Sequence, residues 1–597
     1  MAAAAFGPLF CYRRQIGARH DAHVISTLAP RDGCPKRPKW KAGTMSDDIT
    51  VGDFVAEFLQ AIGVSAAFGV VSVHNTPMLD AIGRRNAIRF IRSRGEAGAG
   101  SMADAYARVT GSLGVLFTST GPGAANACGA LVEARFSGSP VLHITGQTAR
   151  ANVDRGRGTV HDVPDQLGML KSVSKAAYRV RAPEHTIGIL SQAATEALTS
   201  PTGPVSVEIP IDIQRSLLPR PGGLADFKLP LPTPKQADEK ELDELAKMTL
   251  KARRPMLWSG NGGRHATEEV QRFADMGFGV ITSLAGRGVI PEDHPLVLGC
   301  LKDTPRVEEF LRTADLLIIA GSRVRGHETR EFDLHLPSPR IQIDIDPAAN
   351  GRTYDTDLFL CGDAKIGLAG LADRLEGNIQ VEAGFPKEIE TLKNDVIKEY
   401  KSYLGPYGTF SDRLRKVLPR DDIWVRDITL NNSTWGNRIF PLYGPRDGVF
   451  ALGAAIGMGL AHGIGAAIGA PEKKVLCMCG DGGFFMGFAE FWTAAQEGVD
   501  VVLLIMNDGG YGVIKHIQDI FHEGRHYFAD FGNPSLEGCA KLADMPYWCV
   551  NSPSELDPAV TSALEIPGPA LVEVDMSKIG EFPRYFVPPK ADTKYAR

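Results

Sequence analysis

The sequence predicts an α/β protein built of three doubly wound parallel-sheet domains in series. Short apolar runs alternate with amphipathic segments from Thr50 onward, a pattern typical of strands and helices that follow one another in a parallel sheet. A Pro- and Gly-rich stretch over residues 218–234 interrupts this alternation and marks a domain boundary. A chain of 597 residues has room for about three or four domains of ordinary size.

Composition excludes several classes of function. The chain carries 65 basic and 70 acidic residues, a net charge of −5, which argues against a nucleic-acid partner. No apolar run approaches the length of a membrane span, so we expect no membrane association. The nine cysteines show neither CxxC pairs nor zinc-ligand spacing, so we interpret them as reduced and the protein as cytoplasmic.

The first 45 residues differ from the rest because they are rich in Arg and Lys and poor in acidic residues. An organelle-targeting leader has this bias, but the segment has little Ser and no convincing amphipathic helix. We therefore expect residues 1–45 to be a disordered leader, with the folded protein beginning near Met45.

The N-terminal domain is expected over residues 46–216. Its predicted order is a helix at 51–62, a strand at 66–71, a helix from 77, a short strand at 89–91, a helix at 98–110 and strands at 114–119, 141–145 and 205–209. This order predicts one doubly wound sheet.

Two further units follow. A central domain is expected over residues 236–376, with strands at 255–259, 316–320 and 341–346, and a charged helix at 387–400 then forms a connector. A C-terminal domain is expected over residues 405–597.

The strongest local signal lies in the C-terminal domain. Apolar runs at 475–479 and 501–506 flank an amphipathic segment at 484–497, which predicts a βαβ crossover. Gly480, Asp481 and Gly482 follow the first strand, and Asn507 and Asp508 follow the second. Because ligands bind at the carboxyl ends of parallel strands, Asp481 and Asp508 are expected side by side, where they suit Mg²⁺ and phosphate oxygens. The glycines let backbone N–H groups approach a diphosphate.

A second signal lies in the N-terminal domain at Glu96. This carboxylate stands between a short strand and a helix that is rich in small residues. A glutamate there can simply complement the positive end of the helix dipole, or it can be a functional group at the strand end.

Several segments together resemble the thiamine diphosphate-dependent enzymes, in particular the group of acetolactate synthase, pyruvate oxidase and benzaldehyde lyase. The segments that carry the resemblance are 96–108, 118–126, 142–147, 343–347, 480–482 and 507–511. The resemblance implies thiamine diphosphate and Mg²⁺ as cofactors, with the metal on Asp481, Asp508 and the Gly510 carbonyl. It also implies cofactor contacts by Gly480, Gly482, Gly483 and Tyr511. The family usually has Asn-Asn where this chain has Asn507-Asp508, so a carboxylate replaces an amide at the second metal position.

The resemblance also implies a mechanism through a C2 ylid. Glu96 would hydrogen-bond the aminopyrimidine ring and let the cofactor's own nitrogen take the C2 proton. Leu460 falls where the family places the residue that bends the cofactor, and Met458 where a backbone carbonyl accepts from the amino group. In the family the two cofactor-binding domains meet across a subunit interface, which implies a homodimer or homotetramer.

The candidate residues for the substrate pocket lie at and around His74. By resemblance His74 matches an active-site histidine of benzaldehyde lyase, although a lone histidine is more often structural, and Val73, His161 and Asp162 are further candidates for the substrate pocket. The leading interpretation is an acetolactate synthase-like carboligase or decarboxylase acting on a 2-oxo acid. The alternative is a carbon–carbon lyase of benzaldehyde lyase or 2-hydroxyacyl-CoA lyase type.

Two other classes are disfavoured. A non-catalytic homologue has no need of both Glu96 and Asp481, and a nicotinamide dehydrogenase lacks its GxGxxG fingerprint. FAD is left open and is not predicted. Gly321-Ser322-Arg323 resembles a flavin-contacting segment of acetolactate synthases, but residues 298–301 depart from their pattern.

Overall fold

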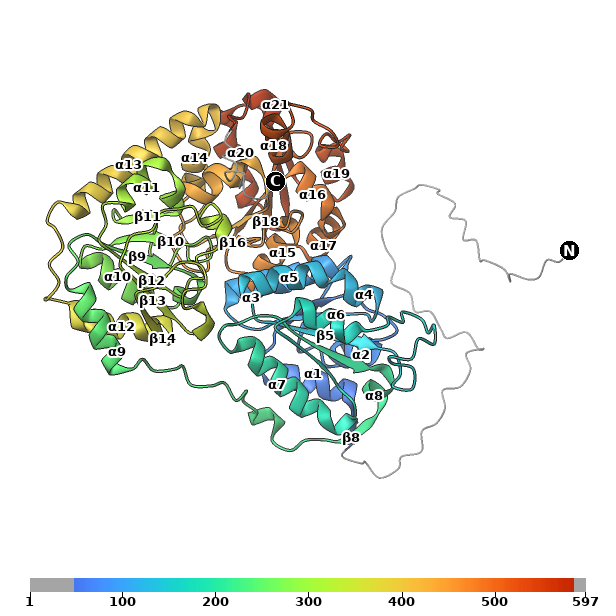
Figure 1. Ribbon diagram of the computed structural model, residues 1–597. Helices are drawn as coiled ribbons and strands as arrows, with labels where there is room; N and C mark the ends of the chain where they lie inside the picture. Colours follow the sequence, from blue (N-terminus) through green and yellow to red (C-terminus); the bar gives the residue numbers. More distant parts are fainter. Residues whose placement is uncertain (1–47, 585–597) are drawn as a thin grey trace, which may run out of the picture. The chain divides into compact units, whose positions relative to one another are not determined.

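The structure is a computed structural model that describes residues 48–584 (Figure 1). It contains three six-stranded sheets, and every pair of neighbouring strands within each of them is parallel. The expected fold class, three parallel-sheet α/β domains in series, is confirmed. The expected leader lies outside the described residues.

The first sheet has the strand order β3-β2-β4-β5-β7-β6. Its strands are β2 (Ala66–Gly69), β3 (Arg89–Arg92), β4 (Gly114–Thr118), β5 (Val141–Gln147), β6 (Ala176–Arg179) and β7 (Val205–Pro210). Its helices are α1 (Val51–Ala61), α2 (Thr76–Arg85), α3 (Glu96–Thr110), α4 (Pro122–Asn126), α5 (Cys128–Ser137), α6 (Gln166–Val173), α7 (Thr186–Leu198) and α8 (Ile211–Arg215). A separate antiparallel pair, β1 (Asp48–Thr50) with β8 (Leu217–Pro219), joins the two ends of this unit.

The second sheet has the order β11-β10-β9-β12-β13-β14. Its strands are β9 (Pro255–Ser259), β10 (Gly279–Thr282), β11 (Val297–Gly299), β12 (Leu316–Ala320), β13 (Arg340–Asp344) and β14 (Leu358–Cys361). Its helices are α9 (Glu239–Thr249), α10 (Thr267–Asp275), α11 (Pro305–Leu311) and α12 (Ala364–Leu375), and α13 (Phe385–Tyr403) forms the expected connector to the third sheet (Figure 1).

The third sheet has the order β16-β15-β17-β18-β20-β19. Its strands are β15 (Ile423–Arg426), β16 (Gly448–Phe450), β17 (Val475–Gly480), β18 (Val501–Asn507), β19 (Tyr547–Val550) and β20 (Ala570–Asp575). Its helices are α14 (Phe410–Val417), α15 (Gly459–Gly469), α16 (Asp481–Met486), α17 (Phe491–Glu497), α18 (Gly512–Phe521), α19 (Leu536–Leu542), α20 (Leu556–Glu565) and α21 (Met576–Ile579).

Two helices differ from their expected bounds in ways that matter for the site. The amphipathic segment 484–497 is not one helix, because α16 ends at Met486 and a short 3₁₀ turn separates it from α17. Helix α3 begins at Glu96 itself, so the carboxylate lies in its first turn.

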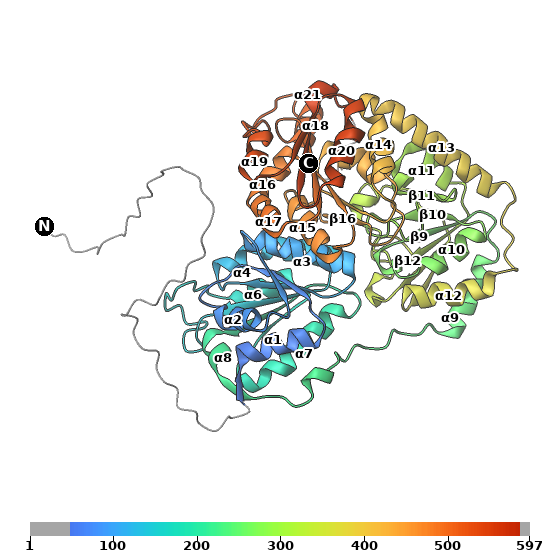
Figure 2. The same ribbon diagram turned by 180° about the vertical axis from the view of Figure 1, so that it is seen from behind.

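Helix α3 packs against α15 of the C-terminal domain, and both views show the two helices side by side (Figures 1 and 2). The approach is close enough that a Cβ on Gly465 would lie 2.2 Å from the carbonyl oxygen of Met102. Buried polar groups cross the same interface: the Asp104 carboxylate lies 2.6 Å from Arg108 and 3.1 Å from the His462 ring. The N-terminal and C-terminal domains of one chain are therefore joined by a tight, hydrogen-bonded helix pair.

Over residues 48–584, none of the helices combines the length and the apolar character that crossing a membrane requires.

Candidate functional site

The carboxyl ends of β17 and β18 carry the two expected carboxylates. Gly480 pairs with Met506 in the parallel register, so Asp481 and Asp508 leave the sheet next to each other. The Asp508 N–H donates to Asp481 Oδ1 at 3.3 Å, and Asn533 Nδ2 donates to Asp481 Oδ2 at 2.6 Å. The structure thus brings these two site residues together and adds Asn533, which the sequence did not indicate.

The electrostatics of this pair favour a divalent cation. Burial, followed by the negative charge of Asp481, raises the pKa of Asp508 to about 7. Burial also raises the pKa of Asp481, whose side chain is fully buried. Two buried carboxylates on neighbouring strand ends repel each other unless a proton or a cation lies between them. The donor set therefore fits Mg²⁺, which prefers hard oxygen ligands.

The third expected metal ligand is a backbone group. The described part of the chain holds no cluster of three or more His, Cys, Asp or Glu side chains, so a carbonyl has to complete a protein ligand set here. A Cβ on Gly482 would lie 2.7 Å from the Tyr511 ring and 3.2 Å from the Gly510 carbonyl oxygen. A side chain at residue 482 would collide with the Tyr511 ring, and the Gly510 carbonyl oxygen lies beside residue 482; its role as a metal ligand stays a prediction.

Asp427, which the sequence analysis did not single out, holds the adjoining segment in place. This fully buried carboxylate accepts from the N–H groups of Gly457 and Gly459 at 3.1 and 3.0 Å. A Cβ on Gly483 would lie 2.9 Å from its Oδ2, so the segment approaches the diphosphate motif closely. Asp427 is therefore a positioning residue between two glycine-rich stretches.

Met458 and Leu460 lie at the start of α15. The Met458 carbonyl accepts the helical hydrogen bond from His462, and Leu460 is 1% exposed within the apolar core. The structure does not bring Leu460 to the surface of the site. Ile456, by contrast, packs beside Gly483 and is partly exposed. The cofactor contacts of Met458 and Leu460 stay predictions.

The second half of the candidate site is Glu96. Its side chain is buried at the carboxyl end of β3, and its Oε2 accepts from Asn126 Nδ2 at 3.2 Å. A Cβ on Gly123 would lie 2.6 Å from Glu96 Oε1, so the Gly-Pro-Gly turn can contact the carboxylate only because residue 123 is glycine. Asn126 fixes the carboxylate from the far end of α4, a role that no local pattern indicated.

A carboxylate from the C-terminal domain caps the helix that carries Glu96. Glu490 accepts from the backbone N–H groups of Arg94 and Gly95 at 3.2 and 3.0 Å, and Thr493 donates to it at 2.7 Å. The N-cap residue of α3 is Gly95, and a carboxylate that accepts from the N-cap N–H plays the part that a glutamate at the third helical position has in a capping box. Glu490 therefore supplies the missing cap from another domain and fixes the start of α3.

Two of the expected substrate residues, His74 and His161, lie together near Glu96. The rings of His74 and His161 lie 5.3 Å apart, and His161 Nδ1 lies 3.3 Å from Ser119 Oγ. Ser119 in turn lies beside Glu96 across Gly123. Burial, then the charges of His161 and Arg215, lower the pKa of His74, so this imidazole is neutral at neutral pH.

The remaining two candidates differ from the histidines. Val73 is exposed. Asp162 accepts from the N–H of Gly158 at 3.2 Å, so its carboxylate caps its own loop.

Within one chain the side-chain hydrogen bonds of Glu96 and of Asp481 run to different partners. The hydrogen bond of Glu96 runs to Asn126 in its own domain, and those of Asp481 run to residues of the C-terminal domain. Among the described residues, no hydrogen bond joins Glu96 to the diphosphate motif.

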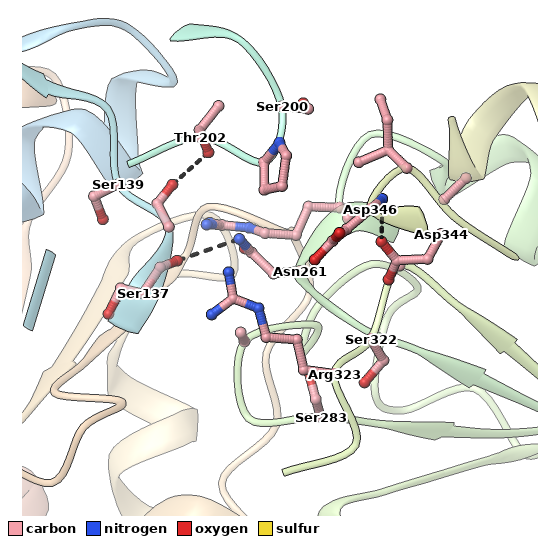
Figure 3. Close-up of a pocket in the computed structure, with 18 of the residues that line it drawn as sticks. Ser137, Ser139, Ser200, Thr202, Asn261, Ser283, Ser322, Arg323, Asp344 and Asp346 are labelled. Carbon is pink, nitrogen blue, oxygen red and sulfur yellow. Dashed lines mark hydrogen bonds between the residues drawn. The ribbon is translucent and has the colours of Figure 1, made fainter. Parts of the chain in front are cut away.

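A large cavity of about 340 Å³ lies elsewhere, where the N-terminal, central and C-terminal domains meet. Figure 3 shows Asn261, Arg323, Asp344 and Asp346 around it, and Asn261 donates to the Ser137 carbonyl at 3.2 Å. Gly321, Ser322 and Arg323 line it, as does part of the glycine turn that begins at Gly260. The segment that resembles a flavin contact thus faces a real cavity.

Comparison with known protein families identifies the class. The domain described as "Thiamine pyrophosphate enzyme, N-terminal TPP binding domain" matches residues 49–169, the central domain matches 242–371, and the C-terminal TPP binding domain matches 430–574. The chain belongs to the thiamine pyrophosphate (thiamine diphosphate) enzyme family, and it is a thiamine diphosphate-dependent enzyme.

Several curated proteins resemble the chain over most of its length. Acetolactate synthase 2 of Nicotiana tabacum is 27% identical and covers 93% of this chain and 86% of its own length. Acetolactate synthase isozyme 1 large subunit of Escherichia coli is 28% identical, with 88% and 94% coverage. A protein of Pseudomonas aeruginosa described as a probable 2-ketoarginine decarboxylase is 29% identical, with 78% and 83% coverage. The chain is thus similar over most of its length to acetolactate synthases and to a probable decarboxylase, and these relatives differ in the reaction that they are named for.

Proposed function

We propose that the protein is a carboligase or decarboxylase that acts on a 2-oxo acid with thiamine diphosphate and Mg²⁺. The observation that carries this proposal is the presence, in one chain, of a buried glutamate held by Asn126 and of a buried carboxylate pair completed by a glycine turn. Such a pair of half-sites has no purpose in a protein that only binds a ligand.

The residues divide the work as follows. Thiamine diphosphate, when bound, supplies the carbanion chemistry and the electron sink. Asp481, Asp508 and the Gly510 carbonyl would hold Mg²⁺, which would supply positive charge for the diphosphate. Glu96 would hydrogen-bond the aminopyrimidine end of the cofactor, Asn126 orients its carboxyl group, and Glu490 fixes the helix that carries it.

We further propose that each complete site is shared between two subunits of a homodimer or a larger homo-oligomer. The support is that, among the described residues, no hydrogen bond joins the Glu96 side chain to Asp481 or Asp508, and that apolar side chains beside each half are exposed. Val71, Val73 and Val160 lie near the Glu96 half, and Met486, Ile514 and Phe528 near the diphosphate half, with exposed fractions of 42% or more. Exposed apolar groups in such numbers are typical of surfaces that become covered.

Mixed dimers test this arrangement. Neither Glu96→Gln nor Asp481→Asn protein alone contains an intact site. In a refolded equal mixture about half of the dimers are mixed, and each of these has one intact site, so activity returns to about a quarter of the wild-type level. If each site were built within one chain, the mixture would stay as inactive as the two variants, which would refute the shared site.

The substrate class rests on the residues around His74. A 2-oxo acid is the common substrate type suggested by the names of the relatives, and the neutral His74 with His161 gives the pocket two groups that can donate and accept protons. The same pair favours the alternative, a carbon–carbon lyase. Incubation of the loaded enzyme with pyruvate and identification of the product separates them: acetolactate supports the carboligase, acetaldehyde a decarboxylase, and no consumption of pyruvate excludes it as donor.

The large cavity between the domains is a candidate site for a nucleotide such as FAD. The support is that Asp344 and Asp346 lie at the carboxyl end of β13, where acidic groups accept from ribose hydroxyls in related sheets, and that Arg323 also lines the cavity (Figure 3). The absorbance spectrum of the purified protein tests for flavin directly. The compartment that we propose is the cytoplasm, supported by the free cysteines among the described residues.

A further inference from the structure

A second, smaller cavity adjoins the large one where the central domain meets β15 and β16. Its volume is about 20 Å³, enough for one species of the size of a water molecule. Four arginines line it: Arg108, Arg264, Arg287 and Arg426. The other described lining residues are Ser137 and small or apolar residues, and none of them carries a carboxylate.

Three of these four guanidinium groups have strong partners. Arg108 pairs with Asp104 at 2.6 Å, and Arg287 Nε pairs with Glu292 at 2.8 Å. Arg264 Nε donates to the carbonyl of Pro445 at 2.8 Å. Their positive charge is neutralised or at least hydrogen-bonded within the protein.

Arg426 is different. It is 1% exposed, and its Nε and Nη1 find no hydrogen-bond partner among the residues that the structure describes. The guanidinium lies over the Phe450 ring at 5.2 Å, a contact that attracts a cation and does not neutralise it. Burial, followed by the charge of Arg287, lowers the pKa of Arg426 to about 9, so the group still carries its proton at neutral pH. A buried charge without a counter-charge is strongly unfavourable.

We propose that this cavity is a binding site for one small anion, held by the guanidinium of Arg426. The anion is either a free halide such as chloride or the anionic end of a ligand in the large cavity. The second source is possible because the two cavities share lining residues: Arg108, Ser137, Arg264, Ala285 and Pro445. The volume suits a single-atom anion. None of the residues assigned to the cofactor or the metal takes part.

The proposed anion site is next in sequence to the residue that holds the segment 457–459. Arg426 is the last residue of β15, and the next residue, Asp427, holds Gly457 and Gly459. An anion at Arg426 therefore stabilises the strand end from which this segment is held.

The test compares thermal midpoints of the enzyme loaded with thiamine diphosphate and Mg²⁺ in sodium gluconate, sodium chloride and sodium bromide at constant ionic strength. Wild type should gain a saturable upward shift in chloride and bromide, as a ligand that binds only the folded state requires. Arg426→Met should lose this shift and should fold without the anion, because it removes the unpaired charge at similar volume. Arg420→Met, which changes an exposed arginine, is the matched control and should keep the wild-type shift.

Two further measurements identify the source of the anion. Bromide in crystals of the wild-type protein should give an anomalous peak beside Arg426, which does not depend on how any variant folds. An Arg426-dependent shift with inorganic phosphate but not with halides would assign the site to a phosphate-bearing ligand. Two outcomes would overturn the proposal. The first is an equal shift of the thermal midpoint with anions in wild type and in Arg426→Met. The second is no shift of the wild-type midpoint with halides or with phosphate, together with no bromide peak.

Discussion

At the scale of single residues, the departure of this chain from its family lies at Asp508. The family usually places an amide there, and the carboxylate puts a second negative charge next to the buried Asp481. Repulsion between the two carboxylates lowers the stability of the metal-free protein, but the same two charges attract a cation. The Asp508 carboxylate should therefore destabilise the protein without metal and strengthen Mg²⁺ binding.

Asp508→Asn tests this reversal. Without metal the variant should have a higher thermal midpoint than wild type, because the repulsion with Asp481 is gone. Its Mg²⁺ affinity, measured by calorimetry, should be lower, because one charged ligand is lost. Asp544→Asn, an exposed position with a φ of 53° that asparagine tolerates, controls for net charge. Equal Mg²⁺ affinity in Asp508→Asn and wild type would contradict the carboxylate's role.

Glu96→Gln should separate binding from turnover. The amide keeps the size of the side chain but cannot give up and take back a proton as a carboxyl group does, so cofactor affinity should stay near wild type while kcat falls by about 10²- to 10⁴-fold. Fluorescence titration with thiamine diphosphate and steady-state kinetics measure the two effects. Turnover close to wild type would remove Glu96 from the mechanism.

His143 should make the N-terminal domain sensitive to acid. It is fully buried between Thr118 and Ser206, each at 2.9 Å, and burial lowers its pKa to about 3. The unfolded chain takes up a proton near the ordinary pKa of 6.5 and the folded chain does not, so stability is lost as pH falls below that value. At about pH 5 the loss is about 2 kcal/mol.

His143→Gln provides the comparison for this effect. The glutamine does not titrate, so acidification from about pH 7.5 to about pH 5 should lower the thermal midpoint of wild type by more than that of the variant. Parallel curves for the two proteins would show that His143 is not the acid-sensitive group.

At the scale of elements, the crossing of α3 and α15 depends on glycine. Gly465→Ala would place a methyl group 2.2 Å from the backbone carbonyl of Met102, which cannot rotate away. We expect a loss of about 1–3 kcal/mol, measured as a lower thermal midpoint. Gly188→Ala in α7 has open space around the new Cβ and should instead stabilise by about 0.5–1 kcal/mol. If both variants gained stability, the close approach would be wrong.

The elements also show what the sequence could predict. Strands with continuous apolar runs, such as β9, β12 and β18, were expected close to their observed bounds because both faces of a parallel sheet are buried. The short strands β6, β16 and β19 lie at sheet edges, where the apolar signal is weak, and they were not predicted from the sequence; neither were the interior strands β10, β15 and β20.

The same division holds for the candidate site. Asp481, Asp508 and Glu96 lie in local motifs and could be found from the sequence. Asn126, Asn533 and Glu490 reach the site from other elements or another domain, and residue spacing carries no information about such contacts.

At the scale of the whole molecule, the linker after the N-terminal domain carries little of the structure. Residues 228–237 are exposed or half-exposed and lie outside helices and strands. Cleavage at a protease site inserted there should leave the fragments associated, because α3 and α15 hold the domains together. Gel filtration under native conditions should show one peak that separates into two bands only on a denaturing gel. Two native peaks would contradict this.

The contact between α3 and α15 also sets where this chain can recombine with its relatives. Three domains in series suggest that any one of them could be exchanged at the linkers that flank it. However, Gly465 and Met102, and Asp104 and His462, form matched pairs from opposite ends of the sequence. A chimera that takes its first and last domains from different parents separates these pairs, whereas one that replaces only the central domain keeps them. The first and third domains are thus inherited as one unit, although about 310 residues of chain separate the end of α3 at Thr110 from the start of β15 at Ile423.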